Sequence, residues 1–238
     1  MTKVPLIGFD RYVDLEWCRS ALEAAATHSS IEVVRDQVAT MLPGIESQRK
    51  TLDVLKRLST KPFEHLDDFI GRGVAIYKRV GQGAVLPLVW GASIASYPFF
   101  GKTAETAGRL LALQGDCSIK ELQRRMAEQY GDRSGVERAV ARILQSQESW
   151  HALTRDETAK RILKLQPAVI DDDELTVWAI EAALRYAGKP VLMFSLQSLP
   201  VMFPFTLTRP LAYVVSNSAN LMVRSEGPSN QLVALKDR

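Results

Sequence analysis

A short run of polar residues is spaced in a way that suits contact with nucleic acid. Its members are Arg133, Ser134, Arg138, Arg142 and Gln145. Arg138 and Arg142 are four residues apart, so a helix would place them on neighbouring turns of one face. An arginine can pair bidentately with guanine or hold a phosphate, and Gln and Ser can contact base edges or the backbone. The same residues would also fit an ordinary solvated helix face, and the sequence leaves both interpretations open.

Two further sets of basic residues could add contacts to phosphates. A hairpin predicted after this helix carries Arg155, Lys160, Arg161 and Lys164. Earlier in the chain, a helix predicted over 46–58 carries Lys50 and Arg57 seven residues apart, on what the spacing indicates is an outward face. The alternative for this second set is again a solvated face. Phosphate contacts would position a protein on DNA without reading its sequence.

The residue types needed for catalysis or metal binding are not grouped in the sequence. The three histidines, His28, His65 and His151, have no spacing suited to a metal ion. Gly71-Arg72-Gly73 lies within a helical pattern without a preceding strand, so it does not predict a phosphate-binding loop. Cys18 and Cys117 lie beside apolar positions and are expected to be buried free thiols. We therefore expect no enzyme activity, no cofactor, no metal and no small-molecule substrate.

The stretch 103–165 must position the first set of residues, and it reads as three helices followed by a hairpin. The first helix is predicted over Thr103–Leu113. A capping box of Ser118 and Glu121 begins the second helix, and another of Ser134 and Glu137 begins the third. Val136, Val140, Ile143 and Leu144 predict the buried face of the third helix. Strands predicted over 150–153 and 160–165, around a turn at 154–158, complete a winged-helix order. In helix-turn-helix proteins the last helix lies in the major groove.

The first hundred residues predict a bundle of five helices. Four are amphipathic, and Gly73 in the fourth is expected to allow close approach of another helix. The fifth comes from Val80–Gly101, which contains no charged residue. This segment is long enough to span a membrane, but its prolines, glycines and Gln82 favour a buried core helix over about 84–97.

The C-terminal part repeats the order of helices followed by a hairpin. The acidic run Asp171–Glu174 is expected to cap a helix that ends at Gly188, because negative charge favours a helix N-terminus. Metal binding is the alternative for this run. Shorter helices are predicted within 191–203 and over 208–217, and a hairpin over 221–224 and 231–235. A second, winged-helix-like module is therefore expected.

Together these elements predict a mainly α protein with an N-terminal helical bundle at 1–101, a winged-helix module at 102–168 and a winged-helix-like module with a short β-hairpin at 169–238. The chain has 238 residues and a net charge of +3. Residues 101–165 hold 12 Lys and Arg against 9 Asp and Glu, so part of the small basic excess lies on the winged helix. The first ten residues do not form a signal peptide, and we expect a cytoplasmic protein without a membrane span.

The chain resembles the BrxA family of BREX bacteriophage-exclusion systems. The resemblance is carried by residues 44–52 (GIESQRKTL), 55–58 (LKRL), 88–91 (LVWG), 97–100 (YPFF), 131–134 (GDRS) and 202–205 (MFPF). It implies a helical protein with winged-helix-like parts that is associated with DNA binding and phage defence. Double-stranded DNA is then the expected partner, together with other phage-defence proteins. The alternative is an adaptor whose winged helices dock proteins of the same defence operon.

Overall fold

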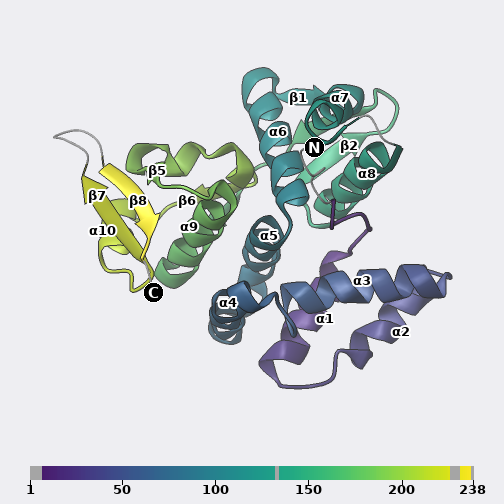
Figure 1. Cartoon of the computed structure of the whole chain (residues 1–238), viewed down its shortest axis with the longest axis horizontal. Coiled ribbons are helices and arrows are strands. Elements are labelled where there is room, and N and C mark those ends of the chain that lie inside the picture. Colours follow the sequence, from purple (N-terminus) through teal and green to yellow (C-terminus); the bar gives the residue numbers. More distant parts are fainter. Residues whose placement is uncertain (1–6, 132–133, 226–230, 237–238) are drawn as a thin grey trace, which may run out of the picture.

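The computed structural model describes residues 7–131, 134–225 and 231–236. The first five helices, α1 to α5, form a bundle. Two smaller modules that combine helices with short strands pack against this bundle (Figure 1). A continuous hydrophobic core runs through all three parts. The predicted fold class, mainly α with small β-hairpin modules, is confirmed.

The bundle holds the five predicted helices, with two 3-10 turns between them. They are α1 (Leu15–Ala26), α2 (Glu32–Met41), α3 (Ile45–Leu58), η1 (Glu64–Leu66), α4 (Asp67–Val80), η2 (Gly81–Ala84) and α5 (Val85–Ser96). At the start of α2 the hydroxyl of Ser30 accepts a hydrogen bond from the backbone N–H of Glu32 (3.2 Å).

The uncharged helix α5 lies inside the protein, as predicted. Its residues from Val85 to Ile94 are buried except Leu86, and Trp90 is fully enclosed. Among the described residues no single helix is long and apolar enough to cross a membrane. Two helical stretches, Glu64–Ser96 and Pro98–Gln114, reach that length and apolarity only as a pair, and a bend of 116° separates them.

The first module has the predicted three helices and hairpin, and one strand that was not predicted. Its elements are α6 (Pro98–Gln114), β1 (Asp116–Ser118), α7 (Ile119–Tyr130), α8 (Ser134–Ser149), β2 (Leu153–Asp156) and β3 (Arg161–Lys164). The strands form an antiparallel sheet in the order β1-β3-β2. This order of helices and strands is the topology of a winged helix.

Two local predictions in this module were wrong. The first strand of the hairpin was placed at 150–153 and lies at 153–156, because α8 continues to Ser149 and Trp150 packs into the core. The turn accordingly moves to 157–160. Ser118 is the N-cap residue of α7, but its side chain accepts no capping hydrogen bond, and Glu121 pairs with Arg124 and Arg125 instead. The side chain of Ser134, on which the other capping box depends, lies outside the described part of the chain.

The second module repeats the topology of the first. Its elements are α9 (Asp173–Ala187), β5 (Val191–Leu192), η3 (Met193–Ser198), η4 (Pro200–Met202), α10 (Leu211–Ser216), β7 (Leu221–Ser225) and β8 (Gln231–Leu235). Its sheet has the order β5-β8-β7, which matches β1-β3-β2 position by position. The 3-10 turns η3 and η4 stand where α7 stands in the first module. A winged-helix-like second module is therefore present, with reduced helices.

A short parallel pair lies outside both winged-helix sheets. Strand β4 (Ala168–Ile170), which follows the first module, pairs with β6 (Phe205–Leu207) of the second module. The sequence predicted neither strand. Three-residue strands carry too few side chains for alternation to be recognised.

Close contacts between helices hold the second module against the bundle. The predicted close approach at Gly73 is confirmed, because a Cβ there would lie 3.0 Å from the indole of Trp178 in α9. A Cβ at Gly91 in α5 would lie 2.3 Å from the same ring. The indole Nε1 of Trp178 donates to the carbonyl of Phe69 (2.8 Å). Two glycines thus make room for one tryptophan between α4 and α5.

Candidate nucleic-acid interface

Helix α8 occupies the position of the recognition helix in the first module. Val136, Val140, Ile143 and Leu144 are all at most 1% exposed, as their spacing predicts. Arg138 and Arg142 are exposed on the other side of the helix, with half-buried Ala141 between them. The guanidinium of Arg142 donates to Oε1 of Gln145 (2.8 Å), so these two predicted site residues are in contact. Arg133 lies outside the described residues, and Ser134 begins the helix.

Three basic residues of the hairpin, Arg155, Lys160 and Arg161, contact carboxylates, and Lys164 is exposed. Arg155 lies 2.5 Å from Glu148 of α8 and 3.0 Å from Glu157 of the turn, and its side chain is only 19% exposed. Lys160 is 66% exposed and lies 3.5 Å from Glu157. Arg155 therefore fixes the hairpin to α8, and Lys160 is the more accessible cation of the two.

Arg161 forms a paired contact across the sheet. Its Nε and Nη2 both donate to the carboxylate of Asp116 at the start of β1. These hydrogen bonds hold the pKa of Asp116 below its usual range. The pair links two strands that are 45 residues apart in sequence, so Arg161 has a structural role that the local sequence did not show.

A hollow of about 450 Å³ brings several of these residues together with one that the sequence did not single out. Arg142, Gln145, Glu148 and Arg155 line it, and Tyr12 forms part of its wall. Tyr12 belongs to the segment before α1, which has no helical or strand periodicity to draw attention to it. Its hydroxyl donates to Asp14 (2.6 Å), and burial raises its pKa to about 12.

The segment that carries Tyr12 is anchored along α8. The backbone N–H of Val13 donates to the hydroxyl of Ser146 (2.9 Å), and the indole of Trp150 donates to the carbonyl of Val13 (2.9 Å). The hydroxyl of Ser149 donates to Asp14 (2.8 Å). These contacts fix the C-terminal half of α8 against the bundle and leave the turn with Arg138 and Arg142 exposed.

The second predicted surface, on α3, is arranged differently from the prediction. The exposed face follows Glu46, Arg49 and Asp53, whereas Lys50 and Arg57 are half-buried. The helix buries Thr51 and Val54 as well as Leu52 and Leu55, so its inner face is wider than the spacing indicated. Lys50 lies 3.4 Å from Glu46.

Arg57 has different partners from Lys50. Its guanidinium donates to the carbonyls of Lys61 (3.2 Å) and Pro62 (3.1 Å) and lies 4.6 Å from the ring centroid of Phe63. Lys50 and Arg57 therefore do not form a single outward surface.

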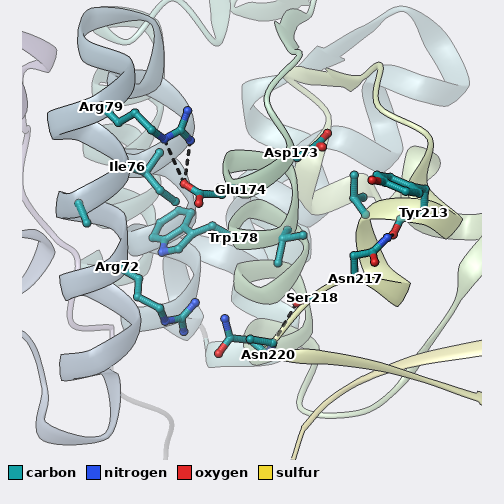
Figure 2. A pocket seen from close by; sticks show the side chains of 14 residues that line it. Arg72, Ile76, Arg79, Asp173, Glu174, Trp178, Tyr213, Asn217, Ser218 and Asn220 are labelled. Carbon is teal, nitrogen blue, oxygen red and sulfur yellow. Dashed lines mark hydrogen bonds and ion pairs between the residues drawn. The ribbon is translucent and has the colours of Figure 1, made fainter.

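Another hollow, of about 500 Å³, lies between α4, α9 and α10 (Figure 2). Ile76, Val177, Trp178 and Val214 contribute apolar surface to it. Its charged rim is internally paired, since Arg79 contacts Asp172 (2.7 Å) and Glu174 (2.9 Å), and Arg209 contacts Asp173 (2.5 Å). The acidic run Asp171–Glu174 thus caps α9 and holds two arginines. Asp172 is the N-cap residue and accepts a hydrogen bond from the backbone of Leu175.

No group of three His, Cys, Asp or Glu residues within the described ranges could hold a metal ion. Cys18 and Cys117 are buried free thiols, as predicted. No protein-family model, no curated protein and no solved structure matches this chain.

Proposed function

We propose that this chain is a non-enzymatic protein that binds double-stranded DNA through the first winged helix. The observation that carries the proposal is the exposure of Arg138 and Arg142 on the outer face of α8, in the position of a recognition helix. Arginines on such a face can contact phosphates or the major-groove edge of guanine. Because Arg155 and Arg161 are ion-paired, we expect few contacts beyond α8 and Lys160, and hence modest affinity.

The resemblance to the BrxA family extends the proposal to a cellular role. We propose that the protein acts in bacteriophage defence, alongside other proteins of a BREX-like system. Most contacts would be to phosphates, so the protein would have little sequence preference.

A salt titration of duplex binding tests the proposal. The logarithm of the binding constant should fall linearly with the logarithm of salt concentration, because each phosphate contact releases counterions. Replacing Arg138→Ala together with Arg142→Ala should weaken binding and lower the slope by about 0.9 for each phosphate that the variant no longer binds. Removal of a base contact should instead cost about 1–3 kcal/mol at one base position.

A matched control removes the same charge elsewhere. Arg35→Ala with Lys78→Ala takes two exposed basic side chains from α2 and α4 and should leave affinity and slope nearly unchanged. If the α8 variant keeps the affinity and salt slope of the unaltered protein, α8 is not the DNA-contacting element.

A protein adaptor is the second candidate, and the second module favours it. Helix α10 stands where α8 stands in the first module, but it carries no Lys or Arg, and Tyr213 on it is 61% exposed. In this proposal the chain would co-purify with proteins of its own operon through a contact that Tyr213→Ala abolishes. Duplex binding would then be weak and independent of Arg138 and Arg142.

A further inference from the structure

A basic hollow lies where the second module meets the bundle. It measures about 380 Å³, and its lining includes four residues that can carry positive charge: His65 of η1, Arg185 of α9, Lys189 just after α9, and Arg224 of β7. Among the described residues that line it there is no Asp or Glu. We refer to this site as the basic hollow.

A buried carboxylate close to the hollow is engaged by arginines. Glu181, whose side chain is 2% exposed, accepts hydrogen bonds from Arg185 (2.8 Å) and from Arg72 (2.8 Å). Arg72 also contacts Asp68 (3.0 Å). The group of Asp68, Arg72, Glu181 and Arg185 therefore carries two positive and two negative charges. Lys189, which is exposed, lies outside that group and adds its positive charge to the basic hollow, which Arg224 also lines.

Two features restrict the site: the side-chain contacts of Arg185 and the backbone on either side of Lys189. The guanidinium of Arg185 lies 5.0 Å from the centroid of the Phe69 ring while Glu181 holds its Nε and Nη2, so this side chain has a defined position. Lys189 follows Gly188, the left-handed residue that ends α9, and Pro190 restricts the backbone after it.

Stacked side chains connect one residue of the hollow to the bundle. His65 stacks on Phe63 with ring centroids 6.0 Å apart, and Arg57 covers Phe63. Arg57, proposed from the sequence as a phosphate contact, is thus linked through Phe63 to His65, which lines the basic hollow.

We propose that the basic hollow binds a phosphate group. Lysine and arginine donate strong, charge-assisted hydrogen bonds to phosphate oxygens, and several such donors converge here from separate elements. Two sources share this chemistry: a nucleic-acid backbone and a free phosphorylated small molecule. A backbone source would place a second contact with nucleic acid at the second module, whose own α10 is uncharged.

Thermal unfolding in the presence of inorganic phosphate tests the site directly. At a phosphate concentration tenfold above Kd, the Tm should rise by about 3–6 °C relative to chloride at equal ionic strength. Lys189→Ala with Arg224→Ala should abolish the rise, and both side chains are exposed, so the fold should persist. Arg35→Ala with Lys78→Ala, which removes the same charge elsewhere, should retain it.

Duplex titration then separates the two sources. If the natural ligand is a nucleic-acid backbone, Lys189→Ala with Arg224→Ala should lower the salt slope of duplex binding by about 1–2. If the natural ligand is a free phosphorylated molecule, the same variant should bind duplex DNA unchanged and lose only the rise in Tm with phosphate. Arg138→Ala with Arg142→Ala should keep the rise in Tm with phosphate. The test of the basic hollow is therefore independent of whether α8 contacts DNA. A Tm of the unaltered protein that is equal in phosphate and chloride, or a phosphate response that survives Lys189→Ala with Arg224→Ala, would overturn the proposal.

Discussion

At the scale of single residues, the structure divides basic side chains that look alike in the sequence. Arg138 and Arg142 are exposed, whereas Arg155 and Arg161 are half-buried and contact carboxylates. The sequence could identify which side of α8 is buried, because that depends on spacing within one helix. It could not show that Asp116 neutralises Arg161, because their contact depends on the pairing of β1 with β3.

One buried residue leads to a prediction about stability. Gln147 of α8 is 0% exposed, and neither polar atom of its amide has a hydrogen-bond partner among the described residues. A buried amide without partners costs free energy, and an apolar side chain of similar shape removes that cost. Gln147→Met should therefore raise the free energy of unfolding by about 1–2 kcal/mol, measured by urea denaturation.

The neighbouring glutamine provides the control. Gln145 is half-buried and already bonded to Arg142, so Gln145→Met should change the free energy of unfolding by less than about 0.5 kcal/mol. A loss of stability in Gln147→Met would show that an internal water molecule satisfies the amide in the native protein.

At the scale of elements, the helices were predictable and several strands were not. Periodicity marks α1 to α4 and α6 to α9, because each buries one side of ten or more residues, whereas α5 was recognised by its lack of charged residues. Strands β1, β4, β5 and β6 have two or three residues each, and partners distant in sequence define them. The same limit applies to Tyr12, which long-range packing alone brings to α8.

The contact between α6 and η4 gives a second prediction. A Cβ on Gly108 would lie 2.0 Å from the carbonyl oxygen of Pro200, a backbone atom that cannot rotate away. Gly108→Ala should lower the free energy of unfolding by about 1–3 kcal/mol, despite the better helix propensity of alanine. Thermal unfolding measures the effect.

Gly83 is the matched site for this experiment. It lies in η2, is exposed, and, apart from its own local backbone and chain neighbours, no atom of the described residues lies within 4 Å of the position that a Cβ would occupy. Gly83→Ala should change the free energy of unfolding by less than about 0.5 kcal/mol. Equal effects at the two glycines would contradict the close packing of α6 on η4.

At the scale of the whole molecule, the three parts share one core. The predicted boundary at residue 101 falls inside α6, and a Cβ at Gly101 would lie 2.4 Å from Tyr186 of α9. Glu181 and Arg72 add an ion pair between the second module and the bundle. The domain limits at 101 and 168 stay predictions, but the packing indicates that the parts depend on one another for stability.

We therefore predict a single unfolding transition. Far-UV circular dichroism and tryptophan fluorescence should give the same Tm, because all four tryptophans, Trp17, Trp90, Trp150 and Trp178, lie in the common core. Arg72→Ala should lower that Tm without splitting the transition. Two separate transitions, or probes that disagree, would show that the second module unfolds independently of the bundle.

The segment before α1 has a consequence for how the chain folds as it is synthesised. Val13 bonds to Ser146 and Trp150, which lie 133 and 137 residues further along the chain. At about 5–20 residues per second, ribosomes reach those partners roughly 7–27 seconds after Val13 is made. This segment thus leaves the ribosome long before its partners in α8 are made, and Phe9, which packs against Trp150 as well as Tyr97 and Phe100 in the folded protein, completes its native contacts only after α8 has emerged.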